Sequence, residues 1–462
     1  QLPYGEIKTY GTPRRLTLLV TNLPEKQADC QTEVKGPAKK AAYDESGQPT
    51  KALLGFCKGQ GVSVENLIEK ELNGALYIYA NKEIKGQDTA CLLPSILEEL
   101  VHKIYFPKPM RWGYGEMRFA RPIHWLVALL GTDILSLRIA GITAGRESRG
   151  HRFLGKQQVI IADPQSYIDA LRQEKVLVDQ EERKALIWQQ VQEAAAACGG
   201  EVKADGELLT EVTFLLEWPT ALVGSFAESY LSMPVEMIIT PMREHQRYFP
   251  VYKKDGSLLP YFIAVRNGDA NHLDIVRAGN EKVLLARLAD AAFFWQEDCE
   301  KPLAENAARL ENIVFHEKLG TLAEKVSRIR QLAAYIAQTL SYNEAEVAYT
   351  DRAVTLMKCD LVSHAVFEFT ELQGIMGKYY ARVSQEPEEV AVAIEEQYLP
   401  RFAGDELPQT KAGIALALAD RLDSIIGFLG LDMQPTGSQD PFALRRQAIG
   451  ICQIIVRHNL PL

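Results

Sequence analysis

The chain has 462 residues, of which 47% are hydrophobic and 24% are charged, so its composition is that of an ordinary globular protein and its length predicts about two to four domains. Its formal net charge of −9 argues against a generally basic nucleic-acid-binding protein, although a local basic face can bind phosphate on an acidic body. No window of about 18 apolar residues occurs, and the N-terminus lacks a basic, apolar leader, which argues against a membrane span and a secretory signal.

The cysteine pattern indicates a reducing compartment. The chain has seven cysteines, an odd number, and none of them forms a C-x-x-C pair. This argues against a zinc ribbon and against a disulfide framework. A cytoplasmic location is therefore expected.

The first segment, residues 1–60, is expected to be rich in β-structure. The stretch 16–23 predicts a strand, and the polar stretch 35–52, marked by proline and glycine, predicts a loop. Another strand is expected over 75–84. An amphipathic helix is expected over 89–104, because its apolar residues recur at helical spacing.

The stretch 108–131, KPMRWGYGEMRFARPIHWLVALLG, combines cations, tryptophans and glycines with an apolar run. A cationic, aromatic loop joined to a rigid apolar element is suited to hold a polyanion or a partner chain, which makes Arg111 and Arg121 binding candidates. The alternative is that the arginines are solvated or hold the front domain together, while Trp112 and Trp125 pack in the core. The apolar run predicts a buried strand or a short core helix.

Basic residues are densest in the loop RESRGHRFLG, residues 146–155. Its guanidiniums repel one another unless an anion or carboxylates neutralise them, and Gly150 and Gly155 would let backbone amides approach a ligand. This loop is our best local candidate for phosphate contact. The candidate residues are Arg146, Arg149, His151 and Arg152. The alternative is a solvated charged turn paired with Glu147. A smaller basic pair lies at Arg14–Arg15.

Residues 61–299 are expected to form an α+β region, because helices and strands alternate there without a regular βαβ rhythm. The stretch MREHQRYFPVY at 242–252 places cations beside aromatic residues, and it adds Arg243 and Arg247 as binding candidates. The clearest elements are expected to be helices over 181–197 and 233–240 and strands over 220–224 and 261–268.

Residues 300–462 are expected to be all-α. A strong helical pattern over 280–298 precedes them, and glycines and prolines then divide the chain into further helices. Near the end, Asp440 is placed to cap a helix that opens with the proline after it. This helix carries Arg445 and Arg446, about 100° apart, so one can face a partner while the other pairs within the fold.

One dispersed constellation in the helical half suggests metal chemistry. His316, Asp360 and Asp420 follow the order and spacing of the HD phosphohydrolase superfamily, whose H…HD…D pattern binds divalent metals that activate water. The middle dyad departs from that pattern, because Cys359 stands where the second histidine is expected and a thiol suits a hard-metal site poorly. His364, one turn from Asp360, could substitute. We expect a degenerate HD-like domain without metal; an active metal-dependent phosphohydrolase is the alternative.

Six stretches together resemble the β subunit family of the bacterial tetrameric glycyl-tRNA synthetase. In chain order, between about residues 108 and 450, they are MRWGYGEMRFARPIHWLVALLG, SRGHRFLG, MREHQRYFPV, FHEKLGTL, KCDLVSHAVFEFTELQGIMGKYYA and DPFALRRQAIG. Such an ordered set is more specific than any single signature. No Walker motif, G-x-G-x-x-G or G-x-S-x-G competes with it.

The resemblance implies a subunit that binds tRNA-Gly and works with a separate α subunit in an α2β2 tetramer. Glycine, ATP and magnesium would bind at the α subunit, and no cofactor is expected on this chain. The front half would be similar to the editing-type domain of the larger phenylalanyl-tRNA synthetase subunit, although no nucleophile and base for editing stand out. Full-length members end in a helical anticodon-binding domain, so we expect this chain to be part of a longer polypeptide.

Overall fold

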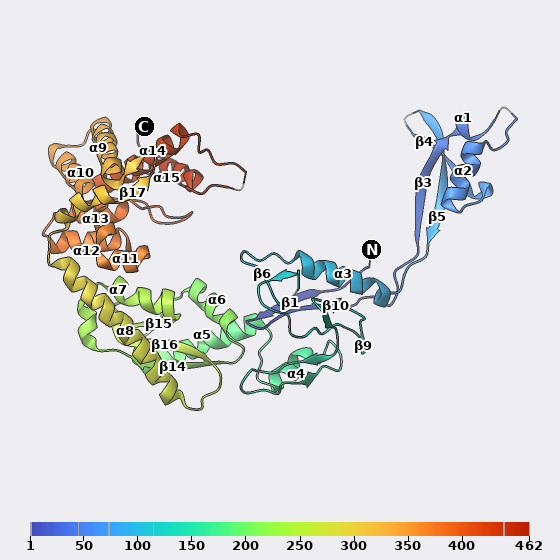
Figure 1. The fold of residues 1–462 in the computed structure, drawn as a ribbon, viewed down its shortest axis with the longest axis horizontal. Helices are drawn as coiled ribbons and strands as arrows, with labels where there is room; N and C mark the ends of the chain where they lie inside the picture. Colours follow the sequence, from blue (N-terminus) through green and yellow to red (C-terminus); the bar gives the residue numbers. More distant parts are fainter. Residues whose placement is uncertain (1, 45, 73, 114, 438, 462) are drawn as a thin grey trace. The chain divides into compact units, whose positions relative to one another are not determined.

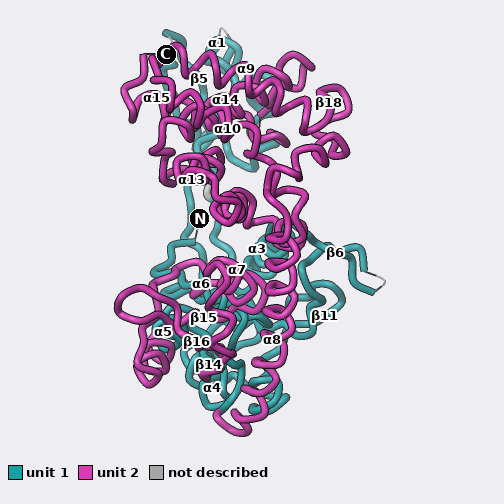
Figure 2. The backbone as a smooth tube through the Cα atoms, turned by 90° about the vertical axis from the view of Figure 1, so that its left-hand side faces the viewer, with its two compact units in different colours: residues 1–187, 212–220, 266–269 teal, residues 188–211, 221–265, 270–462 magenta. Residues whose placement is uncertain are grey.

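The computed structural model describes residues 2–44, 46–72, 74–113, 115–437 and 439–461. The chain divides into two compact units, coloured teal and magenta in Figure 2. Unit 1 holds residues 1–187, 212–220 and 266–269, and unit 2 holds residues 188–211, 221–265 and 270–462. The first unit thus runs to residue 187 and also takes in two short later segments, while the boundaries expected near residues 60 and 299 stay predictions.

Unit 1 begins with a β-hairpin and a small sheet (Figure 1). The hairpin pairs β1 (Ile7–Thr12) with β2 (Arg15–Val20) in antiparallel register. The sheet has the order β3-β5-β4, with β3 at Cys30–Ala38, β5 at Ala75–Ile84 and β4 at Leu67–Leu72. The strands expected over 16–23 and 75–84 are confirmed.

The polar stretch 35–52 is not the expected loop. Its first part belongs to β3, where Lys35 pairs with Tyr79, and α1 (Lys39–Ala42) follows directly. The helix α2 (Lys51–Gln60) then begins at its end. Cross-strand pairing outweighs the turn signals here, and the proline of β3 is tolerated beside a register shift between Lys35 and Ala38.

The rest of unit 1 contains the expected helix α3 (Thr89–Lys103) and then pairs of two-residue strands. These are β6 (Met110–Arg111) with β7 (Arg118–Phe119), β8 (Leu129–Leu130) with β9 (Asp133–Ile134), β10 (Arg138–Ile139) with β11 (Ile142–Thr143), and β12 (Glu147–Ser148) with β13 (Val159–Ile160). The helix α4 (Tyr167–Gln173) follows.

The apolar run that ends the stretch 108–131 is mostly irregular, so the expected continuous strand or core helix is wrong. Ala128 packs in a core with Leu135, Leu137 and Ile139, and its N–H donates to the carbonyl of Gly145 at 3.3 Å. Apolar side chains here fill a core without forming a regular ladder. The run after it folds into hairpins because Ala140 and Gly141, with φ of 50° and 81°, turn the chain back.

The middle of the chain is the expected mixture of helices and strands. The sheet β14-β16-β15 is made of β14 (Pro219–Ser225), β15 (Phe249–Tyr252) and β16 (Leu258–Asn267). The helices are α5 (Gln180–Ala197), α6 (Gly206–Leu215), α7 (Val235–Thr240) and α8 (Leu273–Cys299), with a 3-10 turn η2 (Glu228–Ser232) and a π-helical turn η3 (Pro241–Gln246). The α+β character is confirmed.

The last part of unit 2 is helical, as expected. The α-helices are α9 (Leu322–Thr339), α10 (Glu344–Leu356), α11 (His364–Glu368), α12 (Ile375–Val383), α13 (Glu388–Glu396), α14 (Lys411–Gly430) and α15 (Leu444–Arg457). The 3-10 turns are η4 (Leu303–Asn312), η5 (Cys359–Val362) and η6 (Thr370–Leu372). The helix α14 lies at the centre of the core, with every residue from 412 to 419 buried.

Two details of this helical part differ from expectation. A small hairpin of β17 (Val314–His316) and β18 (Gly320–Thr321) interrupts it, because Gly320 with φ of 82° closes a turn. Near the end of the chain, α15 begins at Leu444, not at the proline after Asp440 as expected. The carboxylate of Asp440 nevertheless accepts the N–H groups of Leu444 and Arg445 at 2.8 and 3.0 Å. None of the described helices has the length and apolar character needed to cross a bilayer.

Candidate functional site

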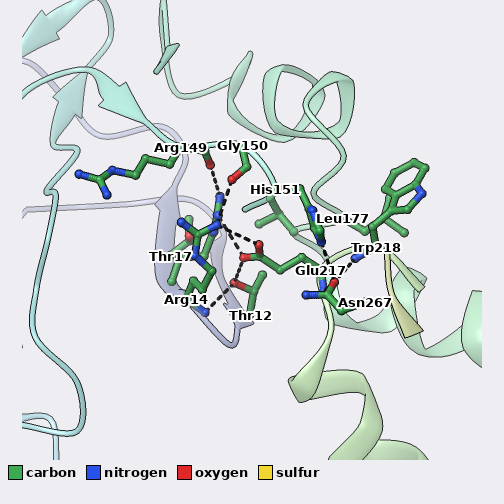
Figure 3. A network of polar contacts seen from close by, with 12 residues as sticks. Thr12, Arg14, Thr17, Arg149, Gly150, His151, Leu177, Glu217, Trp218 and Asn267 are labelled. Carbon is green, nitrogen blue, oxygen red and sulfur yellow. Dashed lines mark hydrogen bonds and ion pairs between the residues drawn. The ribbon is translucent and has the colours of Figure 1, made fainter. Parts of the chain in front are cut away.

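Four arginines of unit 1 gather from two distant segments, and we call Arg14, Arg15, Arg149 and Arg152 the arginine cluster. Arg14 and Arg15 lie at the turn of the β1–β2 hairpin, and the other two lie in the loop between β12 and β13. Backbone contacts join the two segments: Arg14 Nη1 donates to the carbonyl of Gly150 at 3.1 Å, and Arg15 Nη1 donates to the carbonyl of Arg149 at 3.0 Å (Figure 3).

Trp125 is the aromatic centre of the arginine cluster. The guanidinium carbons of Arg14, Arg15 and Arg149 lie 5.6, 5.7 and 5.1 Å from the centroid of its ring. These distances fall in the range of cation–π attraction, about 6 Å or less. Trp125 is therefore more than the packing anchor expected from the sequence. By contrast, Trp112 does anchor its own hairpin, because its Nε1 donates to the carbonyl of Phe119 at 2.9 Å.

Glu217 supplies a buried carboxylate at the base of the arginine cluster. Its side chain is 0% exposed, and it lies 3.0 Å from Arg15 Nη2 and 3.6 Å from Arg14 Nη1. It also accepts the hydroxyl of Thr12 at 2.8 Å (Figure 3). Burial and the neighbouring arginines lower the pKa of Arg14, whereas Glu217 raises it. Arg14 and Arg15 contact this carboxylate, while Arg149 and Arg152 add two further cations nearby, so the arginine cluster has a surplus of positive charge.

His151 positions the loop that carries Arg149 and Arg152. Its ring is fully buried, and Nδ1 accepts two backbone N–H groups of the loop at 3.3 and 3.2 Å. Nε2 must then carry the proton, which it donates to Asn267 Oδ1 at 3.0 Å. The same oxygen accepts the N–H of Glu217 at 2.9 Å. His151 therefore holds the site together rather than facing a ligand (Figure 3).

The glycines of this loop serve packing, so the expectation that their amides approach a ligand is wrong. The N–H of Gly150 donates to the carbonyl of Lys156 at 2.8 Å, and that of Gly155 donates to the carbonyl of His151 at 3.0 Å. A Cβ at Gly155 would lie 2.3 Å from the carbonyl oxygen of Glu174, and one at Gly150 would lie 2.8 Å from its Cβ. Only glycine fits such approaches.

The remaining candidates of unit 1 have different surroundings. Arg146 is used within the fold, because its guanidinium donates to the carbonyls of Thr132 and Ala162 at 2.7 and 3.2 Å. Arg111 lies on β6 with an exposed side chain, and Arg121 is exposed as well. Glu147, which the alternative interpretation pairs with the loop arginines, accepts from Gln158 at 3.5 Å instead.

The arginine candidates of unit 2 differ from this cluster in the contacts that they make. Arg243 forms ion pairs with Asp205 at 2.6 Å and Glu207 at 3.2 Å, and with Glu244. These neighbours raise its pKa, so its charge is already balanced. Arg247 pairs with Glu211 at 2.5 Å. Near the end of the chain, Arg445 donates to the carbonyl of Gly437 at 2.6 Å, and Arg446 is exposed.

Two members of the HD-like constellation are tied to the backbone of unit 2. His316 lies in β17, not on a helix, and its Nδ1 accepts the N–H of Lys318 at 3.3 Å. Asp360 is fully buried, and its Oδ2 accepts the N–H groups of Gly374 and Gly377 at 2.5 and 3.2 Å. A Cβ at Gly377 would lie 3.1 Å from that carboxylate. Burial raises the pKa of Asp360 to about 6.

Lysines surround the third member, Asp420. Its Oδ1 lies 2.9 Å from Lys325 Nζ, and its Oδ2 lies 2.8 Å from Lys358 Nζ. Burial alone would raise the pKa of Asp420, but the two lysines together hold it well below its usual range. Lys325 Nζ also lies 2.9 Å from Asp423 Oδ2. Ammonium groups therefore occupy both carboxylate oxygens that a metal would need.

The thiol and the imidazole near Asp360 do not complete a metal site. Cys359 Sγ donates to the carbonyl of Thr355 at 3.4 Å, and burial raises the pKa of this thiol to about 12. The ring of His364 is stacked on Phe294, with centroids 6.2 Å apart. Within the described ranges, no group of three or more histidine, cysteine, aspartate or glutamate side chains is placed to hold a metal ion. Nothing in these contacts favours the phosphohydrolase alternative.

Sequence reasoning missed two residues on which the arginine cluster depends, Glu217 and Asn267. Each is a polar residue at one end of an apolar run, in LLEWP and AVRNG. That position is a weak signal, because polar residues commonly end strands. The pair Arg14–Arg15 was visible as a basic pair, but its union with the loop 146–155 depends on a hairpin that lies more than a hundred residues earlier.

Comparisons with known proteins agree with the motif resemblance. A family model described as glycyl-tRNA synthetase beta subunit matches residues 1–462. A glycine–tRNA ligase beta subunit of Desulforamulus reducens is 53% identical over 462 residues, and one of Moorella thermoacetica is 50% identical over 460 residues. One of Desulfitobacterium hafniense is 51% identical over 456 residues. These matches cover 99% to 100% of this chain, which spans 66% of the length of each relative.

Proposed function

The chain belongs to the glycyl-tRNA synthetase β subunit family, and from this premise we propose that it binds tRNA-Gly and supports ATP-dependent glycylation carried out by a separate α subunit. The observation that carries the proposal is the family match over residues 1–462. Relatives that share about half of its residues have the same name, glycine–tRNA ligase beta subunit. Cytoplasm is the proposed location, where charged tRNA is used.

The proposed assembly is an α2β2 tetramer. A β subunit is by name one of at least two kinds of chain, so the family name implies a partner subunit. Glycine, ATP and magnesium are proposed to bind at the α subunit. The sequence of this chain agrees with that division, because it contains none of the common nucleotide-binding motifs.

We also propose domain relationships within the chain. The strand-rich front half is proposed to be related to the editing-type domain of the larger phenylalanyl-tRNA synthetase subunit. The helical part is proposed to be a degenerate HD-like domain, in which Lys325 and Lys358 neutralise Asp420. In such a domain His316, Cys359, Asp360 and Asp420 make contacts within the fold instead of binding a metal.

The arginine cluster gives the proposed tRNA binding a physical basis on an acidic chain. The formal net charge is −9, so attraction to RNA has to come from local basic surfaces. The cluster offers several guanidiniums around one buried carboxylate. Contacts of this kind go mainly to phosphates, so tRNA affinity is expected to fall steeply with salt concentration.

Filter binding of tRNA-Gly tests the proposal. The full-length β subunit, the α subunit and their complex are compared over a series of salt concentrations. We expect the complex to bind tRNA-Gly more tightly than the α subunit alone, with a steep salt dependence. If the β subunit added no affinity to the α subunit, the proposal would fail. Elemental analysis of the same preparation separates it from the phosphohydrolase alternative, which requires stoichiometric divalent metal.

A further inference from the structure

We propose that the arginine cluster binds the sugar–phosphate backbone of an unpaired RNA segment, while the exposed ring of Phe153 stacks on one of its bases. This inference rests on the proposed binding of tRNA and goes beyond it, because it names the contact surface and the kind of RNA structure recognised. The surface lies within unit 1 and is made of the β1–β2 turn and the loop between β12 and β13.

The charge of the arginine cluster is divided between a buried base and an accessible rim. The base is Arg15, with a side chain 3% exposed, and Glu217, 0% exposed, whose charges offset each other at 3.0 Å. The rim is made of Arg14 and Arg149, both partly exposed, and Arg152, which is exposed. Glu217 also lies 3.6 Å from Arg14, but its shorter ion pair is the one with Arg15 in the base. The rim therefore has excess positive charge that an anion can offset.

The guanidiniums of the rim also have N–H donors that can bind a ligand. Each guanidinium carries five N–H donors in a planar fork that suits phosphate oxygens. Arg14 donates one hydrogen bond, from Nη1 to the carbonyl of Gly150 at 3.1 Å. The guanidinium of Arg152 lies 5.6 Å from the centroid of the Phe153 ring and makes no hydrogen bond or ion pair with the described residues. Several donors are thus available to phosphate groups.

Phe153 provides a stacking platform at a fixed place beside these cations. The residue is 79% exposed, which is unusual for a large aromatic residue. Its backbone N–H donates to the buried ring of His151 at 3.3 Å, so the loop holds it in position. Exposed aromatic rings next to arginine are typical of sites where unpaired bases stack. The ring and the rim together match a backbone phosphate and the base attached to it.

This combination favours unpaired RNA over two other polyanions. In a duplex the bases are stacked inside the helix, so a single exposed ring would gain nothing from it. An acidic surface of a partner protein could offset the arginines, but it would have no planar group for Phe153 unless it supplied one itself. An RNA segment with unpaired bases uses the ring and the rim at once.

Two single variants and two matched controls test the proposal in the full-length β subunit complexed with its partner subunit. Arg152→Gln removes one rim charge, and Phe153→Leu removes the aromatic face but keeps an apolar side chain. The controls lie elsewhere in unit 1: Arg138→Gln changes an exposed cation that donates to the carbonyl of Gly141, and Tyr105→Leu changes an aromatic residue that is 83% exposed. The probes are tRNA-Gly, a short single-stranded RNA oligonucleotide and a duplex of the same sequence.

We expect Arg152→Gln to weaken binding of tRNA-Gly and of the single strand about fivefold, and to reduce the salt slope by about 1. Phe153→Leu should weaken both about tenfold and leave the salt slope unchanged, because stacking does not release counterions. Wild-type protein should prefer the single strand to the duplex. The two control variants should bind all three probes like the wild type.

The other outcomes separate the two proposals. If the wild-type complex binds tRNA-Gly through its β subunit but Arg152→Gln and Phe153→Leu both behave like the controls, this inference is overturned and the proposed function stands. Equal binding of duplex and single strand, with Phe153→Leu unaffected, overturns the stacking contact. Variants that weaken association with the partner subunit, and not RNA binding, would show that the surface is a protein interface. If the β subunit adds no tRNA affinity, both proposals fall.

Discussion

Two charged clusters of the molecule use their cations in opposite ways. In unit 1 the arginine cluster sets Arg14, Arg15, Arg149 and Arg152 against one carboxylate, and part of it is open to solvent. In unit 2 Lys325 and Lys358 meet Asp420 and Asp423, and we call these four residues the lysine–aspartate cluster. Its side chains are between 4% and 16% exposed.

The difference shows that the number of charged residues does not by itself indicate a ligand site. In the lysine–aspartate cluster every cation has a carboxylate partner, as does the neighbouring Arg328, which pairs with Asp423 at 2.6 Å. Each ammonium also lies over an aromatic ring, Lys325 over Phe315 at 4.5 Å and Lys358 over Tyr398 at 4.3 Å. Its attraction is satisfied within the fold. The arginine cluster has a surplus of charge and an accessible rim. A cation is available to a ligand when it exceeds the nearby carboxylates in number and is also exposed to solvent.

The largest predicted effect concerns the balance in unit 2. Asp420→Ala leaves the ammonium groups of Lys325 and Lys358 buried without the carboxylate that joins them. We expect the free energy of unfolding to fall by about 3–5 kcal/mol, the usual cost of breaking a buried ion pair on one side. Urea denaturation measures it. In the double variant Lys358→Met with Asp420→Leu, the free energy of unfolding should fall by less than the sum of the falls in the two single variants. Strict additivity would contradict an energetic coupling between Lys358 and Asp420.

A smaller loss of stability is expected when a buried carboxylate is removed from unit 1. Glu217→Gln removes the carboxylate from beneath the arginine cluster but keeps a side chain that can accept the hydroxyl of Thr12. The free energy of unfolding should fall by about 2–4 kcal/mol. Inorganic phosphate should restore part of it, because this cluster is open to an anion. The same phosphate should not restore Asp420→Ala, and equal rescue of both variants would erase the distinction between the clusters.

A third prediction concerns a carboxylate of unit 2 that no ion pair balances. Asp360 accepts two backbone N–H groups through Oδ2, and burial raises its pKa from 3.8 to about 6. The neutral carboxyl therefore adds stability that is fully present below about pH 3.8 and is lost as the pH rises through about 6. This rise in pKa corresponds to at most about 3 kcal/mol.

Asp360→Asn stays neutral throughout this range. We expect the variant to equal or exceed the wild type in free energy of unfolding above about pH 6 and to lose that advantage as the pH falls toward 4. Urea denaturation at a series of pH values between these limits measures the difference. Asp351→Asn is the control, because it makes the same chemical change at a side chain that is 63% exposed. A flat difference for Asp360→Asn would contradict the raised pKa.

The elements that the sequence predicted well are those with one strong local period. The helix α3, the strand β5 and the helix α5 all follow from apolar spacing, and each ends near the expected residue. The failures have tertiary causes. The polar stretch 35–52 became partly strand because β5 offers it a partner, and the apolar run before Gly131 fills a core without a ladder. Local pattern does not contain either fact.

The candidate site was predictable only in part, for a related reason. The loop 146–155 was recognisable from its dense cations, and Arg149 and Arg152 do lie in the arginine cluster. Its base could not be inferred, because Glu217 is distant in sequence from the hairpin and is brought to it by the fold. His151 has the residue type of a ligand-binding group but a buried ring. The sequence showed which charges exist and not which of them are already neutralised.

The smallest predicted effect tests that last distinction at Arg243, a binding candidate whose charge is balanced in unit 2 by Asp205, Glu207 and Glu244. Arg243→Gln should lower the free energy of unfolding by about 1 kcal/mol or less, since these ion pairs are partly exposed. Affinity for tRNA-Gly and its salt slope should not fall, in contrast to Arg152→Gln. A reduced salt slope would show that Arg243 exchanges its carboxylates for phosphate, so that balanced charge also takes part in RNA binding.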